Sequence, residues 1–403
     1  MDVDNIAKNF DSYSLLEIKN SNGNIDYDGI VKNLLQNKKF SELDLNTKMV
    51  LKEGENKMKF EIVVGNPPYQ ENVGNPDSNG SLAKQLYPIF MTIGINLNPD
   101  YLTYITPSRW FTGEGQDASF PPLREFIKQN NHIKTIVNYG DNKEVFTEEN
   151  IGSINYFLYD KKYSGNVEFI EMMNGKKTSA IRPLFEEGMD EIIHLNVLVS
   201  ILNKVYKRDD FISMKNITTG RNPFKVPETN EALNRVIVEK KSKKYNLAIR
   251  CANDTLKYTS MDIVHRNFEL VNKWKVYSSK MNGAAGTLMD SKQVSIIGKA
   301  FIGEPNTICS GALITFGCFD SETEALNLQK YMRTKFLRVM VGIMKSSRAI
   351  YQTVYKFVPV QDFTANSDID WSKDIHEIDL QLYKKYSLTE EEVNYIESKI
   401  KEM

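Results

Sequence analysis

Apolar residues come in short runs between residues 60 and 170, and polar segments separate these runs. Runs of this length and composition predict β-strands. The predicted strands cover residues 60–65, 101–105, 133–139 and 154–158. Between the first two strands, apolar spacing predicts a helix with a core face of Leu86, Tyr87, Phe90 and Ile93. Strands that alternate with helices in this way indicate the α/β class.

The pattern changes near Arg182-Pro183, where we expect the α/β unit to end. A connecting helix is predicted from about Glu191 to Tyr206, and the segment Gly220 to Phe224 has the composition of a loop. Short strands are predicted beyond it at 247–250, 275–278, 294–297, 299–302 and 312–316. These strands indicate a second module of mixed α+β structure.

A helix is predicted from Asp320 onwards, because Ser321 and Glu324 have the spacing of a capping box. Its apolar positions fall on one face, which consists of Leu328, Met332, Phe336, Met340 and Ile343. We interpret this stripe as core packing and not as a membrane or cofactor contact.

The strand over residues 60–65 leads directly into Asn66-Pro67-Pro68-Tyr69, the most informative motif of the chain. Ligands of open parallel sheets collect at the carboxyl ends of the strands. Two consecutive prolines fix the backbone and remove two N–H donors, so the neighbouring carbonyls stay available as acceptors. The motif therefore predicts a rigid acceptor site at a strand end.

These acceptors suit the methylation of an exocyclic amine on a nucleic-acid base. The amine lone pair is delocalised into the ring, so a site must localise it before it can attack a methyl donor. The side-chain oxygen of Asn66 and the carbonyl of Pro67 can each accept one N–H, and Tyr69 offers a flat face to the base. Stacking of this kind contributes roughly 1–3 kcal/mol per base. The motif fits adenine N6, and it leaves cytosine N4 and an RNA target open.

The order of segments from Phe60 to about Ile170 resembles the catalytic core of the γ-group amino-methyltransferases of restriction–modification systems, most closely type IIG adenine-specific enzymes. The resemblance rests on the motif and on the segments that follow it: Leu86 to Phe90, Thr106 to Phe111, Leu123 to Ile127, and Glu144-Val145-Phe146. It implies a Rossmann-like core over residues 59–185 with S-adenosylmethionine as methyl donor. It also implies that Phe146 packs against a flipped-out adenine, opposite Tyr69.

The same resemblance implies a target-recognition domain over residues 186–403 that binds double-stranded DNA. It is carried there by Lys273 to Tyr277, by the small-residue loop Asn282 to Gly286, and by Tyr355 to Pro359. Side chains of such loops would read base edges in the major groove. The bases they read are not specified by the sequence.

The donor-binding Gly-rich turn of this family has no counterpart in residues 1–58, where Gly23, Gly29 and Gly54 are isolated. Downstream glycines, such as those of Gly283 to Gly286, do not follow a strand and open a helix. Three alternatives remain open. Residues 1–58 form a reduced donor half, a second polypeptide supplies it, or the sequence is a fragment of a longer enzyme.

Charge is unevenly distributed, although the formal net charge is only −1. Six basic residues oppose one acidic residue between Asn234 and Arg250, and eleven acidic residues oppose five basic ones between Gln361 and Met403. The acidic stretch is expected to form a surface helix or a partner face. The basic stretch suits phosphate contacts. Candidate DNA contacts are Arg109, Lys240, Lys241, Lys243, Lys244, Lys280, Lys292 and Arg348.

The 403 residues, 41% of them hydrophobic, are enough for two domains. Cys251, Cys309 and Cys318 lack the spacing of a metal site, so no structural metal is expected. The cysteine content suits the reducing cytoplasm, and no signal pattern or long apolar run predicts secretion or membrane insertion. We expect a DNA adenine-N6 methyltransferase polypeptide of a restriction–modification or related defence system. The alternative is a non-catalytic DNA-recognition subunit that needs another chain to bind the donor.

Overall fold

The computed structural model describes residues 60–72, 83–112, 118–146, 152–173, 175–252, 255–281, 286–288, 292–345 and 350–403. Residues 1–58, for which a donor-binding remnant was considered, lie outside the described residues. The chain divides into two compact units, Met1–Ile192 and Ile193–Met403. This division falls a few residues after the boundary predicted at residue 185.

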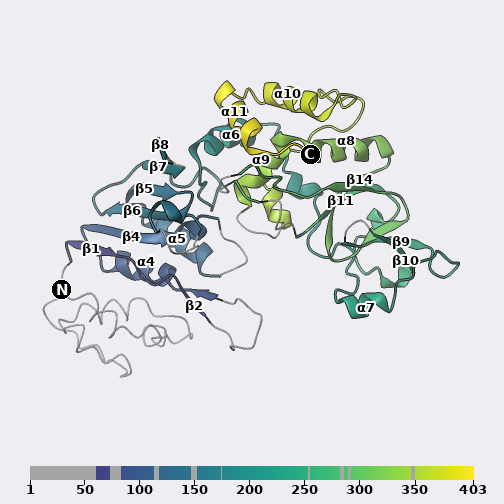
Figure 1. Cartoon of the computed structure of the whole chain (residues 1–403), viewed down its shortest axis with the longest axis horizontal. Coiled ribbons are helices and arrows are strands. Elements are labelled where there is room, and N and C mark those ends of the chain that lie inside the picture. The colour runs from purple at the N-terminus through teal and green to yellow at the C-terminus, as the bar shows by residue number, and fades with distance from the viewer. Residues whose placement is uncertain are drawn as a thin grey trace. The chain divides into compact units, whose positions relative to one another are not determined.

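The first unit contains a six-stranded mixed sheet, whose strands are stacked in Figure 1. Their order across the sheet is β1 (Ile62–Gly65), β4 (Tyr101–Pro107), β6 (Ile154–Asp160), β5 (Ile133–Tyr139), β7 (Val167–Met173) and β8 (Lys176–Arg182). β1 is parallel to β4, whereas β6 is antiparallel to both of its neighbours, β4 and β5. β1, β4 and β5 therefore end at the same edge of the sheet. The four predicted strands are confirmed, while β7 and β8 extend the sheet beyond the prediction.

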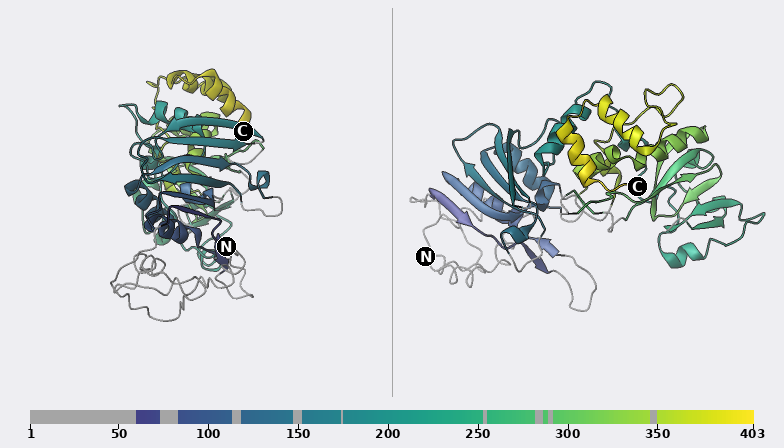
Figure 2. Two further views of the ribbon diagram at one scale, coloured as in Figure 1. Left: turned by 90° about the vertical axis from the view of Figure 1, so that its left-hand side faces the viewer. Right: turned by 45° about the horizontal axis from the view of Figure 1, so that its top comes forward.

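Two helices, α4 (Tyr87–Asn96) and α5 (Phe120–Gln129), pack on one face of this sheet (Figure 2). Each begins with proline in its first turn, where the missing N–H costs no hydrogen bond. Tyr87 and Met91 of α4 and Ile127 of α5 belong to one buried cluster with strand residues. The helix predicted around Leu86 is thus confirmed as a core element.

The second unit contains two three-stranded sheets. One has the order β10 (Leu256–Thr259), β9 (Leu247–Arg250), β13 (Thr307–Cys309), and the other β12 (Ala300–Gly303), β11 (Trp274–Ser279), β14 (Leu313–Phe319). Four of the five predicted strands are confirmed, and β10 and β13 are additional. The strand predicted at Val294–Ile297 is wrong, because Val294 makes only an isolated bridge to Ile400. Ile296 interrupts the extended backbone with a left-handed φ of 62°.

The helices of this unit refine two predictions. The connecting helix α6 spans Asn196–Tyr206 and so begins later than predicted, and α7 covers Asn230–Asn234. The helix expected from Asp320 is two helices, α8 (Glu322–Arg333) and α9 (Lys335–Met344). Thr334 separates them, because its extended backbone ends α8 and its hydroxyl accepts the N–H of Leu337 to begin α9. All five residues of the predicted apolar stripe are buried. Further 3-10 helices are η4 (Met214–Ile217), η6 (Met261–Ile263), η7 (Phe268–Leu270) and η9 (Gln352–Tyr355).

The acidic C-terminal stretch forms α10 (Ile375–Lys385) and α11 (Glu390–Lys399), each of which begins with a complete capping box. Its acidic residues are not all on the surface. Glu392 is buried and accepts hydrogen bonds from Lys204 Nζ and Ser200 Oγ of α6, both at 2.6 Å. Part of the expected partner face is therefore an internal contact of the second unit.

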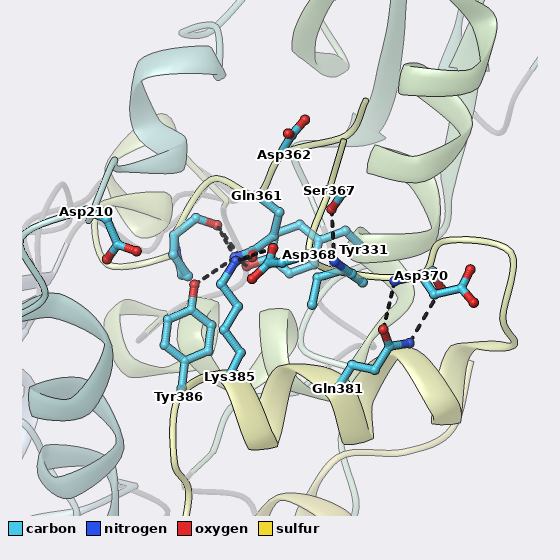
Figure 3. Close-up of polar contacts among 12 residues, drawn as sticks. Asp210, Tyr331, Gln361, Asp362, Ser367, Asp368, Asp370, Gln381, Lys385 and Tyr386 are labelled. Carbon is cyan, nitrogen blue, oxygen red and sulfur yellow. Dashed lines mark hydrogen bonds and ion pairs between the residues drawn. The ribbon is translucent and has the colours of Figure 1, made fainter. Parts of the chain in front are cut away.

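A polar cluster around Lys385 joins α10 to the segment that precedes it (Figure 3). Lys385 Nζ donates to Gln361 Oε1 at 2.9 Å and to Asp368 Oδ1 at 2.8 Å. The amide nitrogen of buried Gln361 donates in turn to the Tyr386 hydroxyl at 2.9 Å. Each polar group in this chain of contacts has a protein partner, as buried polar groups require.

Candidate functional site

The Asn66–Tyr69 motif lies at the carboxyl end of β1, as its position after the apolar run predicted. Asn66 and Pro68 are exposed, Pro67 is buried and Tyr69 is half-buried. The motif thus presents an amide side chain to solvent from a backbone that is anchored in the sheet. This alternation of exposed and buried residues places the two predicted acceptors, the Asn66 side chain and the Pro67 carbonyl, at the sheet edge.

Tyr69 is held from two directions. Its carbonyl accepts the N–H of Leu86 at 3.0 Å, directly before α4. Its ring meets the ring of Tyr87 edge to face, with centroids 6.5 Å apart. Between these contacts the chain forms a short hairpin of β2 (Gln70–Asn72) and β3 (Ala83–Gln85). The start of α4 therefore braces the motif tyrosine.

Gly65, the last residue of β1, allows the neighbouring strand to approach the motif. A Cβ atom at this position would lie 3.1 Å from Cε1 of Tyr104, which is tighter than an ordinary van der Waals contact. Burial raises the pKa of Tyr104 to about 12. The Tyr104 ring thus packs against Gly65 directly before the motif.

Arg109 belongs to η2 (Ser108–Phe111), the 3-10 helix that follows β4. Its side chain is exposed, whereas its neighbours Ser108 and Trp110 are buried. Because β4 is the neighbour of β1 and parallel to it, η2 and the motif start from adjacent strand ends. The structure therefore places the predicted DNA contact Arg109 on the same sheet edge as Asn66.

A row of buried polar side chains lies under this turn. Ser108 Oγ donates to Asn138 Oδ1 at 2.7 Å, and Asn155 Nδ2 donates to Ser108 Oγ at 3.2 Å. Asn155 Nδ2 also donates to the carbonyl of Thr106 at 3.2 Å. The Thr106 hydroxyl faces Asn155 Oδ1 at 3.5 Å. Thr106 and Ser108 lie in the segment Thr106 to Phe111 that carries part of the family resemblance, whereas no motif indicated Asn138 and Asn155. For these two residues, asparagine in an apolar strand is unusual and was the available signal.

Phe146, the predicted stacking residue, follows η3 (Asn142–Glu144) beyond the end of β5 and is half-buried. Its N–H donates to the carbonyl of Asn142 at 2.7 Å. The side chain of buried Asn142 reaches both flanks of this loop, because its Oδ1 accepts the Gly152 N–H at 3.2 Å and its Nδ2 donates to the Phe146 carbonyl at 3.4 Å. Asn142 thus holds the loop that carries Phe146, and no sequence motif indicated this role.

Phe146 and Tyr69 share an edge of the sheet without being adjacent. β5 is the third strand from β1 in the sheet order. With neighbouring strands about 4.8 Å apart, the two loops start roughly 14 Å from each other. The structure thus brings Asn66, Tyr69 and Arg109 to adjacent strands and places Phe146 across the same edge.

The predicted basic contacts of the second unit fall into two groups. Lys240, Lys241, Lys243 and Lys244 are all exposed in the loop between α7 and β9. Lys280 is half-buried at the end of β11, and desolvation lowers its pKa, with Arg221 adding to this effect. Lys292 is exposed. Arg348 and most of the predicted Asn282–Gly286 loop lie outside the described residues.

The described ranges contain no group of three or more His, Cys, Asp or Glu side chains placed to hold a metal ion. In the same ranges, no helix is both long enough and apolar enough to cross a membrane.

Comparison with known proteins places the motif in a family context. Residues 1–146 match the family model of the Eco57I restriction-modification methylases. An uncharacterised adenine-specific methylase of Mycoplasma pneumoniae is 34% identical over 179 residues, which are 42% of this chain and 41% of that relative. The match therefore spans less than half the length of this curated relative.

Solved structures of restriction–modification enzymes are similar at low identity. The type IIG restriction endonuclease BpuSI matches with a TM-score of 0.35 and 14% identity, over 84% of this chain and 53% of that chain. The type IIL enzyme MmeI, solved in complex with DNA, matches with a TM-score of 0.44 and 11% identity, over 83% and 56%. The predicted resemblance to restriction–modification adenine methyltransferases is confirmed by the family match and the curated relative. Residues 1–146 of the chain are thus similar to the Eco57I restriction-modification methylases.

Proposed function

We propose that this chain is a DNA adenine-N6 methyltransferase polypeptide of a restriction–modification system. One observation carries the proposal: Asn66 is exposed at the carboxyl end of β1, between Gly65, the half-buried last residue of this strand, and the braced Tyr69. An amide oxygen held at such a place can accept a hydrogen bond from the amine of a base without prior rearrangement. The Mycoplasma pneumoniae relative, described as adenine-specific, favours adenine over cytosine as the target.

Each residue of the motif has its own part in the proposed reaction. The Asn66 side-chain oxygen and the Pro67 carbonyl accept the two amine hydrogens of the flipped-out adenine, which localises the nitrogen lone pair. Pro68 keeps this backbone rigid. These fixed acceptors also stabilise the positive charge that develops on nitrogen, and such preorganised electrostatic stabilisation is commonly the largest catalytic contribution. Tyr69 stacks on the base, and Phe146 closes on its other face from across the sheet edge.

The elements within each unit support the finer assignment. Residues 59–185 would be a Rossmann-like methyltransferase core, because parallel strands joined by helices bring β1, β4 and β5 to one functional edge. The second unit would be the target-recognition domain, with its exposed lysine loop over Lys240–Lys244 on duplex DNA. Flipping the adenine out of the duplex would deliver it to the motif.

The family implies S-adenosylmethionine as the methyl donor, and we assign no donor-binding turn to the described residues. In the part of the chain that the structure describes, β1 pairs only with β4. The side chains of Ile62 and Val64 on β1 are 62% and 72% exposed. An apolar strand with an open edge favours pairing with a further strand. We therefore propose that the donor half joins the sheet at β1, contributed by residues 1–59, by a second polypeptide, or by a further part of a longer enzyme of which this sequence is a fragment.

The proposed function is tested by the substitution Asn66→Ala, measured as transfer of labelled methyl groups to unmodified duplex DNA. If the chain is active, alone or with a partner, Asn66→Ala should lower the rate by several orders of magnitude and leave DNA affinity unchanged. Asn131→Ala is the matched control, because Asn131 is an exposed asparagine before β5, at the opposite edge of the sheet. Retained activity in Asn66→Ala would remove this residue from the mechanism.

A second candidate function is favoured by the open edge of β1: a DNA-recognition subunit that is inactive without another chain. Calorimetric titration of the purified chain with S-adenosylmethionine, with and without duplex DNA, separates the two. Binding in the micromolar range would make the chain a self-sufficient enzyme. Absence of binding by a folded chain would favour the subunit that depends on a partner.

A further inference from the structure

Buried polar residues of three neighbouring strands form one row beneath the turn after β4. Thr106 pairs with Asn155 in the register of β4 and β6, and Asn155 pairs with Asn138 in the register of β6 and β5. Thr106, Asn155 and Asn138 are all at most 1% exposed. Their side chains and the Ser108 hydroxyl are linked by the hydrogen bonds described above. The row therefore forms a continuous polar network across three neighbouring strands of the sheet, β4, β6 and β5.

The row extends across the strands toward β1, the strand that leads into the motif. β1 and β4 pair with Gly65 opposite Tyr104. If this register continues for two more residues, Pro67 lies opposite Thr106 at the end of the row. The network and the Asn66–Tyr69 motif would thus occupy the same level of the sheet, next to its carboxyl edge.

The network fixes the backbone on one side of Arg109. Ser108, which precedes Arg109, makes two hydrogen bonds through its hydroxyl. On the other side, the carbonyl of Trp110 accepts a hydrogen bond from Nη1 of buried Arg124 at 3.0 Å. Arg109 is thus an exposed cation between two anchored, buried neighbours. An exposed side chain on a backbone fixed in this way loses less entropy when it binds a ligand.

One buried donor of the network destabilises the fold, so packing alone does not explain why it is there. Asn138 Nδ2 is buried and has no hydrogen-bond partner among the described residues. A buried donor without a partner destabilises a fold, and valine or threonine would suit a strand better at this position. Residues that break local rules in this way are concentrated at functional sites.

We propose that Ser108, Asn138 and Asn155 are positioning residues that hold Arg109 against a DNA phosphate beside the target adenine. This inference rests on the proposed function, because it takes duplex DNA as the ligand. Arg109 touches the DNA, and the three buried residues act through Arg109. The phosphate contact fixes the distance between the DNA backbone and Asn66, as phosphate contacts position a protein on its duplex.

The test is a double-mutant cycle on Ser108 and Arg109. The affinity of the full chain for a mixed-sequence duplex oligonucleotide is measured by fluorescence anisotropy over a range of salt concentrations. Ser108→Ala, Arg109→Ala and the double variant are compared, with Ser108→Thr as the variant that keeps the hydroxyl. Arg109→Ala should weaken binding and lower the salt slope by about one. Ser108→Ala should weaken it in part, and should add nothing once Arg109 is absent.

Two controls separate positioning from simple stability. Thermal unfolding identifies variants that do not fold, and Asn138→Ala replaces Ser108→Ala in the cycle if the latter fails, since it removes only one of the two Ser108 bonds. Thr92→Val removes a buried hydroxyl outside the row, one that donates to the Pro88 carbonyl within α4 at 3.0 Å, and should leave DNA affinity within about twofold of the wild type.

Each outcome decides the proposal. A combined effect in the double variant no larger than that of Arg109→Ala, together with near wild-type binding by Ser108→Thr, supports it. Multiplying effects of the two substitutions, or unchanged binding in Ser108→Ala, overturn it. Unchanged binding in Arg109→Ala overturns it as well, while the proposed function is judged separately by methyl transfer in Asn66→Ala.

Discussion

The carboxylate of Asp379 in α10 accepts the backbone N–H of Phe336 at 2.8 Å and so caps the start of α9. The N–H of Lys335 donates to the other carboxylate oxygen at 2.9 Å. The first N–H groups of a helix have no partner within the helix, so an acceptor from another element satisfies them. This contact joins two helices of the second unit through a buried acid.

Asp379 predicts a pH dependence of stability. Its burial raises the pKa of the carboxyl to about 6, against the opposing effect of the two backbone donors and of Arg338. In the unfolded chain the pKa is about 3.9. Between these values the folded state binds more protons than the unfolded state, so this contribution is complete below about pH 4 and is lost as the pH rises through 6.

Urea unfolding of the wild type and of Asp379→Asn between pH 4 and 7 measures this contribution. The difference in unfolding free energy between the two proteins should change by up to about 3 kcal/mol over that window. The ion pair between Lys335 and Glu397 lies nearby and is common to both proteins. A pH-independent difference would show that Asp379 does not take up a proton in the folded state.

Gly94 allows α4 to approach the sheet more closely than a residue with a side chain would. A Cβ atom there would lie 2.7 Å from Leu102 Cδ1 and 2.8 Å from the Tyr104 hydroxyl. Gly94→Ala should therefore destabilise the first unit by about 1–3 kcal/mol, the usual cost of overpacking, less the gain of up to about 1 kcal/mol from helix propensity. Gly220→Ala is the matched control, because a Cβ at Gly220 meets nothing within 4 Å. Equal melting temperatures for the two variants would contradict the close contact.

We expect binding of the target base to depend on the aromatic ring of Phe146. If Phe146 stacks on the flipped adenine, Phe146→Ala should lose about 1–3 kcal/mol of transition-state stabilisation, whereas Phe146→Tyr should lose little. The comparison is made by kcat/KM for methyl transfer with DNA as the varied substrate, in the active form of the enzyme. Equal activity of Phe146→Ala and the wild type would leave Phe146 as a loop anchor without contact to the base.

We expect the exposed lysines of the loop between α7 and β9 to contribute a salt-dependent part of the affinity for DNA. Replacing Lys240, Lys241, Lys243 and Lys244 by alanine should weaken binding and lower the slope of log affinity against log salt by roughly one for each lysine on a phosphate. A matched control replaces four exposed lysines elsewhere, namely Lys176, Lys177, Lys384 and Lys401. An unchanged slope in the loop variant would show that these lysines do not contact DNA phosphates.

Sequence periodicity was sufficient for the central elements and failed where tertiary contacts override it. The strand at 133–139 has the bounds that its apolar run predicted. The apolar stripe from Leu328 to Ile343 was read as one helix, because spacing alone does not show that Thr334 turns the backbone away and starts a second helix. Val294–Ile297 has the composition of a strand, yet Ile296 adopts a left-handed conformation that β-branched residues rarely adopt.

The residues of the candidate site differ in the same way, because some follow from a local motif and others only from tertiary contacts. Asn66 and Tyr69 were found from the sequence because a short contiguous motif carries their chemistry. Asn138 and Asn155 are far from Ser108 in the chain and meet it only through strand pairing, so no local pattern shows these contacts. The only mark of the two residues in the sequence is that they are asparagines within strands.

The ion pair between Lys204 of α6 and Glu392 of α11 brings the first and the last helix of the second unit together. A unit whose two ends meet can be exchanged as a cassette, since its replacement leaves a neighbouring domain with a single point of attachment. If the second unit is the recognition domain proposed above, recombination of the whole unit would change the DNA preference and leave the strand ends that hold Asn66 unaltered.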